Sequence, residues 1–148
     1  MAHLRTDKSL SRILHLFTVL VFGVAISTAP VRAADDFSWH SIADAIALKL
    51  NEAVVAHRAD DAKGAKRALT RAYFGVFESQ KMEAALRKTM GQTHAFKVER
   101  MFTGLRSQIG NQSHDAFADA VQDLVAQLHD DADKLDTAGI PKEVYDAQ

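Results

Sequence analysis

Apolar residues recur every three or four positions through most of the chain after residue 33, which is the spacing of one face of an α-helix. A first helix is predicted over residues 39–58, with Ser38 as its N-cap. Its apolar stripe consists of Trp39, Ile42, Ile46, Leu50, Ala53 and His57. A second helix is predicted after Asp60 and Asp61, whose carboxylates suit a helix start. Its stripe consists of Ala65, Leu69, Ala72, Tyr73 and Val76, with Phe77 on the flank.

The pattern changes after Glu78. The next stripe would be rotated by more than about 90° from the previous one if a single helix continued through it. That stripe consists of Met82, Ala85, Leu86, Thr89 and Met90. Two interpretations exist: the helix breaks near Ser79 and Gln80, with Ser79 as a new N-cap, or it continues and meets a different neighbour. The mismatch of period favours the break.

Two further helices follow, with N-caps predicted at Thr93 and Ser113 and a turn over residues 110–112. Their stripes are Ala95, Val98, Phe102, Leu105 and Ile109, and then Phe117, Val121, Leu124, Val125, Leu128, Ala132 and Leu135. Both prolines, Pro30 and Pro141, lie outside the helical region. Four stripes with short connections predict an all-α fold, an antiparallel up-and-down four-helix bundle whose second helix is broken near Ser79.

Residues 1–33 have a different character. A basic leader with Arg5, Lys8 and Arg12 precedes an apolar run from Ile13 to Ile26. In the segment from Val31 to Ala33, small or apolar residues then stand at the two positions that a signal peptidase reads. This is the composition of a secretory signal peptide. A membrane-spanning helix needs about 20 apolar residues, so a retained anchor is the weaker alternative. We therefore expect a signal peptide over residues 1–33, a helical domain over residues 34–148, and a periplasmic or secreted protein.

Composition and charge narrow the function classes. Without residues 1–33 the chain carries 14 Lys and Arg against 18 Asp and Glu, a net charge of −4. Nucleic-acid binding needs a positive field, so the prediction is no nucleic-acid partner. The absence of cysteine excludes disulfides, thiolate zinc sites and iron–sulfur clusters, and any metal would need oxygen or imidazole ligands.

No reactive constellation is visible in the sequence. There is no glycine-rich phosphate loop, nucleophile elbow or zinc-protease histidine pair. No two of the domain's five histidines are three or four residues apart, so no single helix presents two of them as a metal clamp. These histidines are His40, His57, His94, His114 and His129. We expect His57 to be a buried core residue and His94 to be exposed, and we expect no enzymatic activity.

Three of the five glutamates gather around the predicted break, namely Glu78, Glu83 and Glu99. Glu78 ends a helix, where the dipole disfavours an anion and a nearby cation would relieve it. Carboxylates from different helices are the usual way in which a bundle holds a hard metal ion such as iron. The alternative is structural: Glu83 stands four residues before Arg87, an ordinary helix pair, and Glu78 can pair with Lys81.

Aromatic residues offer a second candidate surface. Tyr73 and Phe77 are most simply explained as core or boundary residues. Phe74, however, falls opposite the second stripe, and Phe96 falls off the stripe of its own helix. We therefore predict Tyr73, Phe74 and Phe96 as partner-binding residues.

Three segments support a family resemblance: Ala72-Tyr73-Phe74-Gly75-Val76-Phe77-Glu78, then Met82-Glu83, then Glu99-Arg100-Met101-Phe102-Thr103-Gly104-Leu105. Together they resemble the extracytoplasmic N-terminal domain of bacterial high-affinity, Ftr-type iron permeases. Residues 34–148 contain no Arg-Glu-x-x-Glu motif, which that family carries in its membrane domain, and we expect no membrane domain within them.

The resemblance implies a free-standing accessory domain or a split component. Its partner would be a membrane iron permease or another component of iron uptake. Glu78, Glu83 and Glu99 would either contact an iron ion or hold the fold. The rival hypothesis is a helical protein-interaction module without metal.

Overall fold

The computed structural model describes residues 37–143, and within this range the chain is helical and contains no β-strand. The all-α prediction is therefore confirmed. The elements are α1 (Trp39–Arg58), α2 (Ala62–Ala72), the π-helix η1 (Tyr73–Glu78), α3 (Met82–Thr89), α4 (Gln92–Gln108) and α5 (His114–Thr137). The predicted signal peptide, residues 1–33, lies outside the described residues. None of the described helices combines the length and the apolar character that a membrane crossing requires.

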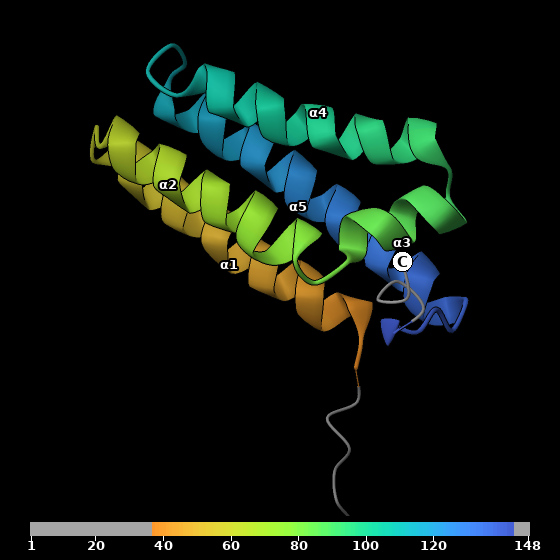
Figure 1. Ribbon diagram of the computed structural model, residues 1–148. Coiled ribbons are helices and arrows are strands. Elements are labelled where there is room, and N and C mark those ends of the chain that lie inside the picture. The colour runs from red at the N-terminus through yellow and green to blue at the C-terminus, as the bar shows by residue number, and fades with distance from the viewer. Residues whose placement is uncertain (1–36, 144–148) are drawn as a thin grey trace, which may run out of the picture. The chain divides into compact units, whose positions relative to one another are not determined.

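The longer helices lie side by side, and α3 lies beside the end of α2 and η1 (Figure 1). α1 packs against both α2 and α5, while α4 packs against α3 and α5. The predicted stripe of the first helix is buried in full, from Trp39 to His57. Because each helix turns its apolar stripe inward, one continuous core forms between them. Its largest fully buried side chains include Trp39, Phe77, Phe117, Ile46 and Leu50.

The predicted break is present at residues 79–81, and a π-helix precedes it. The helical backbone of η1 ends at Glu78, and α3 begins at Met82. A π-helical turn closes by an i→i+5 hydrogen bond and so holds one residue more than an α-turn. Phe77, five residues after Ala72, is consequently fully buried, while Val76 is only partly buried. The prediction that placed Val76 on the stripe and Phe77 on its flank was wrong by this one residue.

Three predicted N-caps are confirmed. The side chains of Ser38, Asp61 and Ser113 accept hydrogen bonds from the amides three residues later. Ser79 is not the N-cap of α3, because its hydroxyl donates to the Gly75 carbonyl and so serves the preceding helix. Lys81, with φ 68°, occupies that cap position and turns the chain. Thr93 lies inside α4, whose N-cap is Gly91 with φ 90°, a value that glycine adopts without strain.

A carboxylate of α5 fixes the start of α1. The amides of Trp39 and His40 donate to the Asp136 carboxylate at 2.8 and 3.1 Å. These are first-turn amides without a partner inside their own helix, and an anion also suits the positive end of the helix dipole. The Trp39 indole Nε1 donates to the Ile140 carbonyl at 2.6 Å. The N-terminus of α1 is thus held against the C-terminal part of α5.

Candidate functional site

The three predicted glutamates lie around one tyrosine. Tyr73 and Glu78 belong to η1, Glu83 to α3 and Glu99 to α4. The charges of Glu99, Glu78 and Glu83 all act on the Tyr73 hydroxyl. Residues five apart lie on one face of a π-helix, so Tyr73 and Glu78 share a face of η1. We call these four residues the carboxylate–tyrosine cluster.

The guanidinium of Arg87 pairs with two carboxylates of this cluster. Arg87 Nη2 donates to Glu83, one turn before it on α3, and also to Glu99 of α4 at 3.1 Å. The same guanidinium lies over the Phe96 ring, with 6.0 Å from Cζ to the ring centre. The pair expected between Glu83 and Arg87 therefore exists, and it extends across to the next helix.

Two residues of the cluster, Tyr73 and Glu83, have pKa values shifted toward their neutral forms. Burial, together with the charges of the three glutamates, raises the pKa of Tyr73 to about 12. Burial also raises the pKa of Glu83, against the opposing effect of Arg87, and a hydrogen bond with Glu99 adds to the rise. Arg87 is in contact with Glu83 and Glu99, and a bound cation would add positive charge among the three carboxylates.

The carboxylates do not form a closed ligand set as they stand, because Arg87 bridges Glu83 and Glu99. Within residues 37–143, the group whose possible ligand atoms all lie within 4.8 Å of one another is His40, Asp44 and His129. Sequence reasoning missed this group because it looked for two histidines on one helix. A His-x-x-x-Asp pair on each of two helices, at residues 40–44 and 129–133, was the available signal.

The off-stripe aromatics are exposed. Phe74 is 55% exposed and Phe96 is 41% exposed, while Tyr73 is half-buried. Phe74 and Tyr73 also line a groove of ≈ 220 Å³ between α2 and α4. The rest of its lining is Leu69, Thr70, Phe102, Thr103 and Arg106. Apolar surface thus lies next to the carboxylate–tyrosine cluster.

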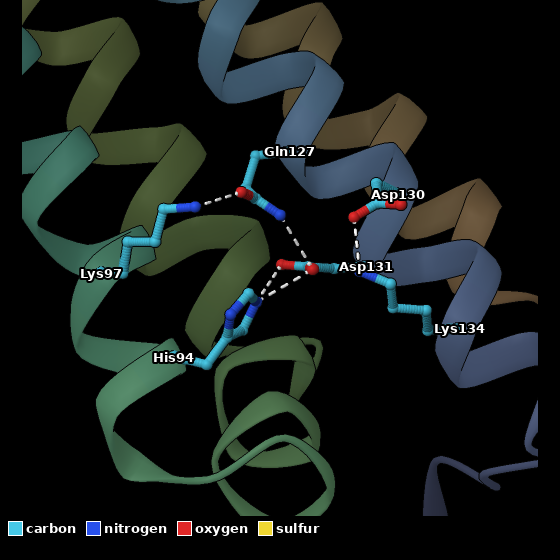
Figure 2. Close-up of polar contacts among 6 residues, drawn as sticks. All are labelled: His94, Lys97, Gln127, Asp130, Asp131 and Lys134. Carbon is cyan, nitrogen blue, oxygen red and sulfur yellow. Dashed lines mark hydrogen bonds and ion pairs between the residues drawn. The ribbon is translucent and has the colours of Figure 1, made fainter.

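A buried polar network crosses from α4 to α5 (Figure 2). Asp131 is fully buried, and His94 Nε2 lies 2.8 and 2.9 Å from its two oxygens. Gln127 also donates to Asp131, and Lys97 donates to Gln127. The prediction that His94 is exposed was therefore wrong: it is half-buried, because it satisfies a carboxylate on the apolar face of α5. This network is a structural connection between the two helices.

Comparisons of the chain with models of protein families, with curated proteins and with solved structures find no match.

Proposed function

We propose that the chain is an exported, periplasmic accessory domain of an iron-uptake system that binds or relays iron at the carboxylate–tyrosine cluster. The observation that carries this proposal is the convergence of Glu78, Glu83 and Glu99 from three elements around Tyr73. The role is binding rather than catalysis. In this proposal the domain also docks on a membrane permease or another uptake component.

The oxygen ligands of this cluster favour hard cations. Carboxylate and phenol oxygens suit iron and manganese better than soft metals. The Arg87 side chain is 47% exposed, so it can turn outward into solvent and leave Glu83 and Glu99 to an arriving cation. A π-helical turn at the cluster supports a functional role, since such turns occur frequently at functional sites. The choice of iron rests on the resemblance to Ftr-type iron permeases.

Calorimetric titration with ferrous iron under anaerobic conditions tests the proposal, with manganese as a redox-quiet substitute. The binding heat of one site should disappear in the triple variant Glu78→Gln/Glu83→Gln/Glu99→Gln. It should persist in Glu52→Gln/Glu143→Gln, which removes the chain's other two glutamates. Arg87→Gln should bind more tightly, because it removes the competing cation. Equal heat in wild type and the triple variant would contradict the proposal.

A metal-free interaction module is the second candidate, and the exposure of Phe74 and Phe96 favours it. Phe74→Ala and Phe96→Ala should then abolish capture of a co-expressed permease partner without changing the melting temperature. Leu48→Ala and Val55→Ala are matched controls, since these apolar side chains are 61% and 68% exposed. If the partner is still captured after both phenylalanine changes, the hypothesis of an interaction module is contradicted.

We also infer an antiparallel, up-and-down four-helix bundle, in which α2 and η1 together form the second helix. The short connections support this arrangement. So does the direction of the chain, which the colours of Figure 1 show to reverse from each long helix to the next.

A further inference from the structure

We propose a second metal site, separate from the carboxylate–tyrosine cluster, on the surface between α1 and α5. It would bind a divalent first-row transition metal through His40, Asp44 and His129. α1 presents His40 and Asp44 one turn apart, and α5 presents His129 and Asp133 one turn apart. Each of the two helices thus brings one histidine and one aspartate to the same place.

The pairs cross between the helices. His40 Nε2 lies 2.6 Å from Asp133 Oδ1, and His129 Nε2 lies 3.3 Å from Asp44 Oδ1. The two imidazole rings are 5.2 Å apart, centre to centre. One possible ligand atom from each of His40, Asp44 and His129 lies within 4.8 Å of the other two. To bind one ion, these three atoms would approach one another by rotation of their side chains.

The His129–Asp44 contact has the separation of two ligands of one ion. Two atoms that each lie about 2.0 Å from a tetrahedral zinc ion are about 3.3 Å apart. His129 Nε2 is buried and makes no hydrogen bond within the described part of the chain, although its approach to Asp44 is short. Buried polar atoms normally have a partner, so this nitrogen is suited to metal coordination.

The donor set selects the class of metal. Two imidazoles with one carboxylate suit zinc, copper, nickel or ferrous iron better than calcium or magnesium. Asp44 is exposed and His40 and His129 are half-buried, so solvent can reach the ion and fill a remaining position. Asp133 would hydrogen-bond a ligand or join as a fourth one.

The frame of the site is rigid. Asp136, one turn beyond the His129–Asp133 segment, accepts the amides of Trp39 and His40 and so fixes the start of α1 against α5. Ligands carried by packed helices hold their geometry better than ligands carried by loops. The site is therefore largely formed before a metal arrives.

Zinc titration of the chain, prepared without a histidine tag, tests this inference. His40→Gln/His129→Gln should weaken zinc binding at least tenfold, and Asp133→Asn should weaken it by about 10- to 100-fold as an outer partner. His114→Gln is the control, since His114 is an exposed histidine on the same helix. X-ray absorption of the zinc-bound wild type should show two imidazole ligands.

Unchanged zinc affinity in the double variant, or equal losses in His114→Gln, would overturn the inference. Asp44→Asn is a further variant that should remain folded, because the Asp44 side chain is exposed. Full zinc affinity in this variant would also count against the site. Glu78→Gln/Glu83→Gln/Glu99→Gln should leave zinc binding intact, so the two sites fail independently. If the His–Asp contacts only tie the helices together, these changes will alter the melting temperature and not the zinc heat.

Discussion

At the residue scale, Tyr73 reports most directly on the charge of the carboxylate–tyrosine cluster. Its hydroxyl is partly buried and faces the charges of Glu99, Glu78 and Glu83. Ionising the phenol would add a fourth negative charge to this cluster. The phenol is therefore a sensitive probe of whether the three carboxylates gather as described.

The prediction is that Tyr73 ionises at about pH 12, against about 10 for an ordinary tyrosine. Tyr145→Phe leaves Tyr73 as the chain's only tyrosine, so ultraviolet absorbance of the phenolate follows it alone. Glu99→Gln in that background should lower the midpoint, because it removes one repelling charge. A midpoint near 10 in both variants would refute the gathering of the carboxylates.

Asp131 and His94 supply a second prediction at this scale. His94→Leu should destabilise the fold by about 3–5 kcal/mol, because it leaves a fully buried carboxylate without its main partner. The double change His94→Leu/Asp131→Leu should recover most of that loss, since neither charge remains buried. Urea denaturation of both variants measures it. Equal stability of the single and double variants would show that the two residues are not coupled.

At the element scale, the π-helix η1 decides which residues enter the core. Phe77→Ala should cost about 3–5 kcal/mol, because it empties a fully buried position. Val76→Ala should cost much less, since Val76 is only partly buried. Urea denaturation of the two variants distinguishes the registers. A larger loss for Val76→Ala would indicate a continuous α-helix through this segment instead.

Helix positions followed from the sequence because apolar spacing and polar caps act locally. The stripe from Trp39 to His57 and the caps Ser38, Asp61 and Ser113 are of this kind. The π-turn did not follow, because no local pattern distinguishes an i→i+5 turn from a break. It places Phe77 where α-helical spacing expects Val76.

The residues of the candidate sites also differ in whether the sequence could predict them. Glu78, Glu83 and Glu99 were found because glutamate is scarce and clusters near the break. The burial of Asp131 and the crossing of His40 and His129 with carboxylates of the opposite helix depend on which helices pack together. Such contacts join residues far apart in the chain, and spacing within one helix does not specify them.

At the scale of the whole molecule, four of the five histidines in the described range lie between α1 and α5. His40 and His129 meet near the start of α1, and His57 and His114 meet near its end, with 3.2 Å between their Nδ1 atoms. Burial and the neighbouring His114 lower the pKa of His57, against the opposing charge of Asp60. The protonated form of His57 is thus disfavoured in the folded protein.

The stability of the fold should therefore decline in mild acid. Well above a pH of about 6.5, the ordinary pKa of histidine, His57 is neutral in both states and contributes no pH dependence. As pH falls below this value, the unfolded chain takes up a proton at His57 that the folded chain resists, so unfolding becomes easier. His57→Gln should flatten the decline in urea midpoints between about pH 7 and 5, whatever its effect on absolute stability. The same slope in the variant would contradict this assignment.

The central claim, that the carboxylate–tyrosine cluster takes up a cation, is tested most directly by anomalous diffraction at the iron edge from crystals loaded with ferrous iron without oxygen. We predict a peak in contact with Glu78, Glu83 and Glu99, with Arg87 turned away from Glu83 and Glu99. An iron-loaded crystal with no peak there, and with Arg87 still bridging the two glutamates, would contradict it. A peak at His40 and His129 alone would support the second site and not the first.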